Sequence, residues 1–262
     1  MTSDCSILEN SCLKGCYRRI VFSAPEIAAK AEPGQFVHIR IPTLHDRVLR
    51  RPFSICGYDP QAGTLTVVYK VVGAGTSELA ETLPGRVCDV MGPLGKGYPM
   101  PSADETPILV AGGYGSAAIL PLAERSAEKG ILLLGARSSA DIILTEEYEN
   151  AGYEVRLATQ DGSLGRRGLV TELLDGALAD AKKTPVLYAC GPTPMLMALG
   201  KIAVEKNVKC YLSLDQHMCC GIGACFACVV KVKDPSSPDG WRYSRSCKEG
   251  PVYTADEVYY EA

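Results

Sequence analysis

Four cysteines close to the C-terminus have the most specific spacing for chemistry in this sequence. Cys220, Cys225 and Cys228 lie in the run CGIGACFAC, with four and then two residues between neighbouring cysteines, and Cys247 follows after 18 more residues. This spacing is typical of the ligands of a plant-type two-iron two-sulfur (2Fe-2S) cluster. Gly-rich loops of this kind can wrap a compact cluster, because glycine adopts left-handed conformations at little steric cost. The pattern therefore predicts a protein that transfers single electrons.

Other metal sites remain open at this point. A structural zinc site also uses four cysteines, but such sites favour two short C-x-x-C pairs. Cys219 lies beside Cys220, so the first ligand could be Cys219 in place of Cys220. The spacing to Cys225 favours Cys220. A Rieske-type centre takes two histidines. The chain has three histidines, His38, His45 and His217, but the four cysteines already supply all the ligands that a 2Fe-2S cluster needs.

Composition limits the classes of protein to consider. With 262 residues and 47% hydrophobic content, the chain can form two or three units, each with its own core. The net charge of -3 and the absence of a basic run argue against nucleic acid or an anionic membrane as a partner. Twelve cysteines without an N-terminal apolar signal segment predict a cytoplasmic protein with free thiols. No chemistry is assigned to Cys5, Cys12, Cys16, Cys56, Cys88 and Cys210.

The residue pattern changes twice along the chain, and this predicts three domains. Residues 1–102 contain short β-branched and aromatic runs, such as 36–41 and 65–72, broken by glycine and proline, and predict an antiparallel β-barrel. In residues 103–214, apolar strands alternate with helices, and this predicts an α/β domain with an open parallel sheet. Residues 215–262 form a small, loop-rich domain with the cysteines. The strands expected in the middle domain are 108–111, 131–134, 155–158, 186–189 and 210–214, and the helices are 117–129, 168–180 and 194–206.

Two motifs in the first domain suit a flavin nucleotide. Arg51-Pro52-Phe53-Ser54 brings a guanidinium, an aromatic ring and a hydroxyl together on an extended segment, and arginine offers a planar fork of donors to a pyrophosphate. Residues 70–77 form a glycine-rich turn before an expected helix start, where free N–H groups attract phosphate. Taken alone, each motif is also compatible with a strand edge or a plain turn.

Two motifs in the middle domain suit a dinucleotide. Residues 109–116 form an apolar strand, a glycine turn and a helix start, a geometry that brings backbone N–H groups close to a pyrophosphate. Cys190-Gly191-Pro192 ends another strand at the same carboxyl edge of the sheet, where open α/β sheets bind their ligands. The alternative for the second motif is an ordinary strand-to-helix connection with Thr193 as N-cap and Pro194 at the first helical position, and both interpretations can hold together.

Taken together and in this order, residues 51–54, 112–116 and 190–192 resemble the ferredoxin-NADP reductase superfamily. Essentially the whole chain closely resembles a narrower family, the electron-transfer subunits of dihydroorotate dehydrogenase B. This likeness rests on residues 159–165, 168–171, 212–215, 218–228 and 246–253.

The resemblance implies a relay in pyrimidine (UMP) biosynthesis. A partner subunit with FMN oxidises dihydroorotate, and its electrons reach NAD⁺ through the 2Fe-2S cluster and FAD of this chain, with two copies of each subunit. The implied FAD site comprises Arg51, Pro52, Phe53, Ser54, Val68, Tyr69, Lys70, Gly75 and Thr76; the NAD site comprises Gly112, Gly113, Gly115, Cys190, Gly191 and Pro192; the cluster ligands are Cys220, Cys225, Cys228 and Cys247.

Several points stay open. Arg137 after the second strand of the middle domain suits a 2′-phosphate, whereas the resemblance implies NAD. The same motifs also fit a flavin and iron-sulfur NAD(P)H reductase subunit that serves ferredoxin, a hydrogenase or sulfur reduction. A zinc-stabilised binding module without redox activity is the alternative from another class. We assign no catalytic acid or base, and the chain is too short to add a dihydroorotate-binding barrel of about 250 residues.

Overall fold

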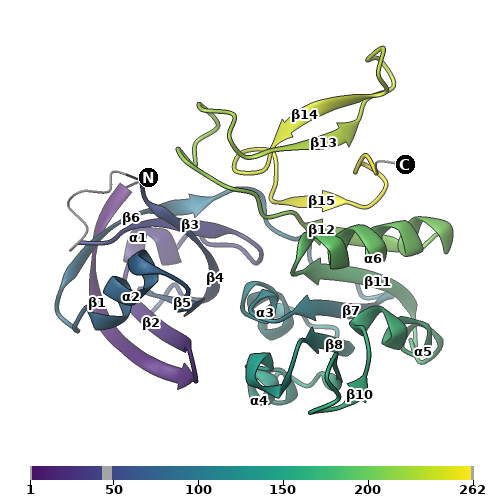
Figure 1. Ribbon diagram of the computed structural model, residues 1–262, viewed down its shortest axis with the longest axis horizontal. Helices are drawn as coiled ribbons and strands as arrows, with labels where there is room; N and C mark the ends of the chain where they lie inside the picture. The colour runs from purple at the N-terminus through teal and green to yellow at the C-terminus, as the bar shows by residue number, and fades with distance from the viewer. Residues whose placement is uncertain (1, 43–48, 261–262) are drawn as a thin grey trace.

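The computed structural model describes residues 2–42 and 49–260, so His45 lies outside the described part of the chain. A β-barrel, a sheet with helices on both faces and a C-terminal segment are arranged around a common junction (Figure 1). This arrangement confirms the predicted fold class. The domain boundaries at residues 102 and 214 stay a prediction.

The barrel is closed and antiparallel, with strand order β1-β2-β5-β4-β3-β6. Side chains alternate between the two faces of β5. Leu65, Val67 and Tyr69 belong to the barrel core, whereas Val68 points the other way and packs toward the neighbouring sheet. The barrel elements are β1 (Thr2–Lys14), β2 (Tyr17–Ser23), α1 (Pro25–Ala28), β3 (Phe36–Arg40), β4 (Arg51–Asp59), β5 (Thr64–Lys70), α2 (Ala74–Glu81) and β6 (Val87–Leu94).

The sheet has seven strands in the order β10-β9-β8-β7-β11-β12-β15, and all neighbours are parallel except the edge strand β15. Its central strand β7 is buried almost throughout, as an apolar strand covered on both faces should be. The strands are β7 (Glu105–Gly112), β8 (Ile131–Ala136), β9 (Glu154–Thr159), β10 (Arg166–Arg167), β11 (Thr184–Cys190), β12 (Lys209–Ser213) and β15 (Val252–Thr254).

Two groups of helices cover this sheet. One core lies beneath α3 and α4 and includes barrel residues, and the other lies beneath η2, α5 and α6. All five predicted strands are confirmed, but the helix expected over 168–180 is wrong in its first half, because residues 170–173 form a 3-10 turn. The helical elements are α3 (Gly115–Arg125), η1 (Ser139–Asp141), α4 (Thr145–Asn150), η2 (Val170–Leu173), α5 (Leu174–Ala179) and α6 (Thr193–Glu205).

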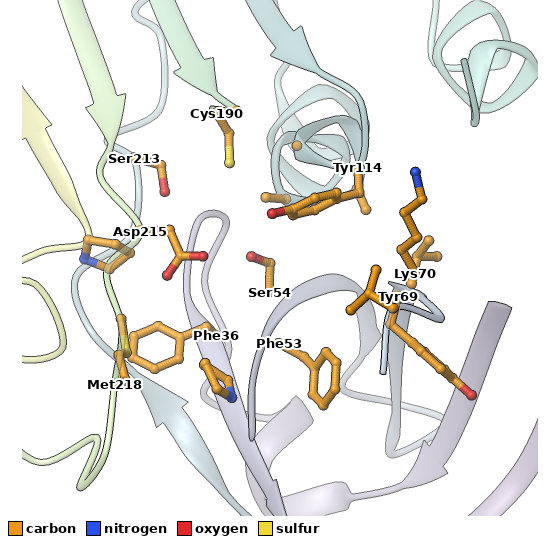
Figure 2. A pocket seen from close by; sticks show the side chains of 18 of the residues that line it. Phe36, Phe53, Ser54, Tyr69, Lys70, Tyr114, Cys190, Ser213, Asp215 and Met218 are labelled. Carbon is orange, nitrogen blue, oxygen red and sulfur yellow. The ribbon is translucent and has the colours of Figure 1, made fainter. Parts of the chain in front are cut away.

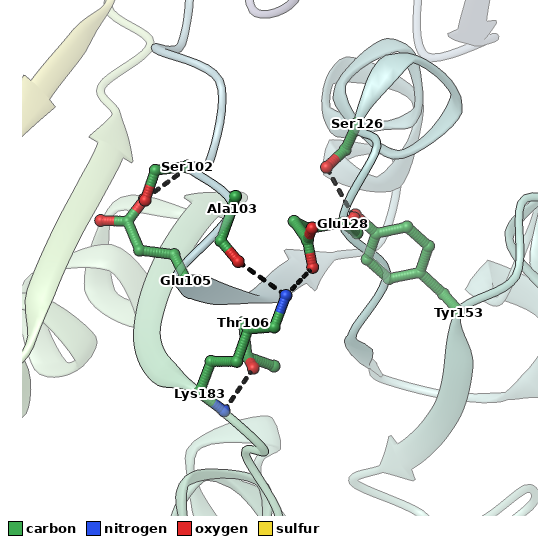
Figure 3. Close-up of polar contacts among 8 residues, drawn as sticks. All are labelled: Ser102, Ala103, Glu105, Thr106, Ser126, Glu128, Tyr153 and Lys183. Carbon is green, nitrogen blue, oxygen red and sulfur yellow. Dashed lines mark hydrogen bonds and ion pairs between the residues drawn. The ribbon is translucent and has the colours of Figure 1, made fainter.

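Polar contacts hold the segment that connects the barrel to the sheet. The Lys183 ammonium donates to the Ala103 carbonyl and pairs with Glu128, while its backbone N–H donates to the Thr106 hydroxyl (Figure 3). Glu105 accepts the N–H of Ser102. These bonds tie the connecting segment to the amino ends of β7 and β11, at the edge of the sheet opposite the predicted cofactor turns.

A second set of contacts holds the barrel against α3 and α4. The Arg125 guanidinium lies 3.6 Å from the ring centroid of Tyr58 and donates to its carbonyl. Arg19 pairs with Glu147 at 2.8 Å. Because these pairs join different domains, they help to fix the space between the barrel and the carboxyl edge of the sheet.

The C-terminal segment contains more regular structure than its sequence suggested. After the cysteine loop (residues 218–228), β13 (Val229–Lys233) and β14 (Trp241–Arg245) form a hairpin, and residues 234–240 join them. The chain then returns to the sheet, where β15 pairs antiparallel with β12. The cysteine loop is therefore anchored at both ends next to the sheet. In the described ranges, 2–42 and 49–260, no helix has the length and apolar character needed to cross a membrane.

Candidate functional site

A cavity of about 280 Å³ lies where the barrel, α3 and the segment after β12 meet (Figure 2). Ten of the predicted cofactor residues line it, so the fold brings together motifs that are far apart in the sequence. These are Pro52, Phe53, Ser54, Val68, Tyr69, Lys70, Thr76, Gly115, Cys190 and Gly191. Nine other lining residues were not among the predicted site residues, although Val72 and Tyr114 lie within the predicted motifs: Phe36, Val72, Tyr114, Ala117, Ala118, Ser213, Asp215, Met218 and Pro251.

Strand β4 presents the aromatic and hydroxyl groups of this cavity. The Phe53 ring packs edge-on against Tyr69, with centroids 5.8 Å apart. The Ser54 hydroxyl points into the same space as the Asp215 carboxyl group and the Tyr114 ring (Figure 2). The Tyr69 hydroxyl instead donates to the Asn10 side chain, 3.1 Å away in the barrel. An aromatic wall with a few convergent polar groups is what a planar heteroaromatic ring requires.

Two predicted flavin residues do not line the cavity. The Arg51 guanidinium donates to the Leu49 carbonyl, and Gly75 lies in the first turn of α2. The next residue, Thr76, does reach the cavity, and its hydroxyl accepts the N–H groups of Val72 and Gly73 at 2.9 and 3.2 Å. Thr76 thus satisfies donors at this helix start that would otherwise be free for a ligand.

A second cavity of about 460 Å³ lies at the carboxyl ends of β7, β8 and β11. The predicted dinucleotide residues Gly112, Gly113 and Pro192 line it, as does Arg137, which follows β8. Parallel α/β sheets bind ligands at this edge. The location therefore suits a nucleotide.

The glycines of this edge have two different roles. A β-carbon on Gly112 would lie 2.5 Å from Cδ of Pro192, and one on Gly115 would overlap the Cys190 carbonyl oxygen. These glycines are required because the two turns pack against each other. Gly113 has open space around its α-carbon and a φ of +54°, so it is the turn residue that leaves room for a ligand.

Lys70 and Tyr114 line both cavities, which are therefore adjacent. The Lys70 ammonium lies 2.6 Å from Asp141, which also accepts the Tyr17 hydroxyl at 2.7 Å. These hydrogen bonds, first from Lys70 and then from Tyr17, lower the pKa of Asp141. A barrel cation and an anion from the middle domain thus meet at the boundary between the cavities.

Burial sets the protonation of two further groups in the first cavity. It raises the pKa of Cys190 to about 12, so this thiol stays protonated and is a contact rather than a nucleophile. It also raises the pKa of Asp215, which comes directly before the cysteine loop region. Asp215 is the acidic side chain of this cavity.

The four predicted cluster ligands lie in two pairs. The Cys225 N–H donates to the Cys220 sulfur at 3.4 Å, and the Cys247 N–H donates to the Cys228 sulfur at 3.5 Å. Partial burial alone would raise the pKa of Cys220, but backbone N–H groups directed at its sulfur outweigh it and lower the pKa to about 6. Within residues 2–42 and 49–260, no three His, Cys, Asp or Glu side chains are grouped as ligands of one metal ion. Two cysteine pairs fit a cluster of two irons.

The two pairs differ in burial and surroundings. Cys228 and Cys247 are each 2% exposed and pack against Phe36, with Met218 alongside, whereas Cys225 is exposed. Phe36 and Met218 also line the first cavity. The buried cysteine pair is therefore separated from that cavity by the side chains of Phe36 and Met218.

Comparisons with known proteins agree with this geometry. Residues 215–259 match the family model of the iron-sulfur cluster binding domain of dihydroorotate dehydrogenase B, which supports the iron-sulfur interpretation over zinc. A solved structure of an NADH-dependent reduced ferredoxin-NADP oxidoreductase, determined to study electron bifurcation, superposes with a TM-score of 0.83 at 29% identity, over 98% of this chain and 90% of that one.

Curated relatives are similar over nearly the whole length. The electron transfer subunit of dihydroorotate dehydrogenase B (NAD⁺) from Geobacillus kaustophilus is 42% identical over 232 residues, covering 87% of this chain and 86% of the relative. The subunit of the same name from Shouchella clausii is 38% identical and covers 91% of each. The chain therefore belongs to the family of electron transfer subunits of dihydroorotate dehydrogenase B.

Proposed function

We propose that this chain carries electrons from a dihydroorotate-oxidising partner subunit to NAD⁺, in the pathway that makes UMP. The observation that carries the proposal is the contact between sites: Phe36 and Met218 line the first cavity and pack against Cys228 and Cys247. The first cavity in turn shares Lys70 and Tyr114 with the second. In one chain the cysteine loop and the two cavities therefore lie next to one another, which supports a path for electrons between them.

The residues of each site suit one cofactor. The cysteine pairs would hold the 2Fe-2S cluster, and the first cavity would hold the flavin ring of FAD against Pro52, Phe53 and Ser54. NAD would lie in the second cavity, with its phosphates near Gly113 and the start of α3. FAD supplies the conversion between hydride pairs and single electrons. The chain's own residues bind and orient these groups and separate the buried cysteines from water.

The family name implies a catalytic partner subunit. This partner would contain FMN and convert dihydroorotate to orotate, and two copies of each subunit would assemble. The exposed half of the cysteine loop suits contact with such a partner, because Ile222 and Phe226 expose 58% and 57% of their surface there.

One experiment tests the proposal directly. The chain is purified without oxygen together with its co-expressed dihydroorotate-oxidising subunit, and dihydroorotate-dependent formation of NADH is measured. We expect activity only when both subunits are present, and about two irons and one FAD per copy of this chain.

The similar reductase structure suggests the competing partner, reduced ferredoxin. NADH formation from reduced ferredoxin, without any from dihydroorotate, would replace the proposed electron donor. A preparation without iron and flavin would contradict both versions.

A further inference from the structure

His38 is a buried histidine, and neither of its ring nitrogens has a hydrogen-bond partner among the residues that the structure describes. Strand β3 explains its position by alternation. Val37 and Ile39 enter the barrel core, so Phe36 and His38 face outward, toward the C-terminal segment. Buried polar groups almost always have partners, so an unpaired one requires an explanation.

The cysteine loop covers His38. A β-carbon built on Gly221 would lie 3.0 Å from both Cε1 and Nδ1 of His38, so the imidazole edge that carries Nδ1 faces the loop. Gly221 directly follows Cys220 and has a φ of +70°. The His38 ring also lies 5.6 Å from the Phe36 ring, which packs against Cys228 and Cys247. The histidine therefore lies beneath the loop, next to the ring that contacts the buried cysteines.

The imidazole is neutral in this position. Burial first, and then the charge of Arg50, lower the pKa of His38 to about 4. A neutral imidazole has one N–H donor and one acceptor. The Arg50 guanidinium, whose charge acts on the imidazole, is itself paired with Asp89. With its proton on Nδ1, the nitrogen that faces the loop, a neutral His38 offers the cysteine loop a hydrogen-bond donor.

We propose that His38 donates a hydrogen bond to a sulfur atom of the cluster held in the cysteine loop, and thereby raises the reduction potential of that cluster. The inference rests on the proposed function only in requiring a 2Fe-2S cluster in this loop. A loaded loop gains sulfur acceptors, which satisfy the donor that otherwise has none. Hydrogen bonds to sulfur favour the reduced, more negatively charged cluster and so raise its potential.

Two variants of the purified, cluster-loaded chain test this. His38→Leu removes the donor, whereas His38→Gln keeps an N–H group. His217→Gln is the matched control, because it changes a histidine near the same loop. We expect the reduction potential of the cluster to fall by about 59 mV in His38→Leu, a tenfold change in the equilibrium constant for one electron. A redox titration followed by electron paramagnetic resonance measures it. His38→Gln should retain most of the wild-type value, and the control should retain all of it.

An unchanged potential in a His38→Leu protein with full iron content would overturn the inference. If that variant does not fold, the wild-type chain still gives an answer. With ¹⁵N-labelled histidine, pulsed paramagnetic resonance of the reduced cluster should detect a coupled nitrogen, and His217→Gln should leave it in place. Coupling to exchangeable hydrogen without nitrogen would identify water as the donor and also overturn the inference. A chain that never binds iron would instead contradict the proposed function.

Discussion

At the scale of single residues, charge and hydrogen bonding define the boundary between the two cavities. Asp141 accepts hydrogen bonds from Lys70 and Tyr17, which belong to another domain. The carboxylate thereby fixes the ammonium group that lines both cavities. The choice of Cys220 over Cys219 as the first predicted cluster ligand also depends on contacts of single residues.

Asp141→Asn should destabilise the chain at neutral pH by roughly 0.5–1 kcal/mol, as expected for a partly exposed ion pair. Because the folded pKa of Asp141 is lowered, the wild-type advantage is fully present above the unfolded pKa of about 3.9 and is lost as the pH falls through the folded pKa. Thermal melts of both proteins at several pH values measure this. A difference that grows on acidification would contradict the assignment.

Cys220→Ser should lose the cluster, whereas Cys219→Ser should keep about two irons per chain. The reason is that the Cys220 sulfur receives the N–H of Cys225 and lies beside that cysteine. Iron and sulfide assays on anaerobically purified variants distinguish the two. Loss of iron in Cys219→Ser with retention in Cys220→Ser would move the first ligand by one residue.

At the scale of elements, two turns at the carboxyl edge of the sheet pack on each other without room for side chains. A β-carbon on Gly191 would lie 2.7 Å from Cε of Met195 and 2.9 Å from the Gly112 nitrogen. The turns after β7 and β11 therefore behave as one unit. Any widening of one turn displaces the other and changes the second cavity, which residues of both turns line.

Gly112→Ala should destabilise the chain by about 1–3 kcal/mol, because the new methyl group meets Pro192 at 2.5 Å. Gly176→Ala is the control: its β-carbon would meet only Arg156, at 3.7 Å, and alanine favours the helix by up to about 1 kcal/mol. Chemical denaturation compares the two variants with wild type. Equal stability of Gly112→Ala and wild type would show that the turns separate easily.

At the scale of the whole molecule, local patterns in the sequence were more informative than contacts between distant segments. The cysteine spacing and the apolar strands such as 131–134 depend on neighbouring residues, so they could be recognised directly. Phe36, Asp215 and Met218 became cavity residues only because the chain returns past β12 and the barrel packs beside it. No short-range signal marks such contacts. His38 was considered only as an unneeded ligand, because burial without a partner cannot be seen in a sequence.

The central claim is that the three adjacent sites form one path for electrons. It is tested most directly by adding dihydroorotate, without oxygen, to the assembled complex and following the cluster by paramagnetic resonance and the flavin by absorbance. We predict that dihydroorotate reduces both cofactors of this chain and that NAD⁺ then reoxidises them. In a complex with Cys228→Ser in this chain, its flavin should stay oxidised. Reduction of this flavin by dihydroorotate without the cluster, or a cluster that dihydroorotate never reduces, would contradict the account.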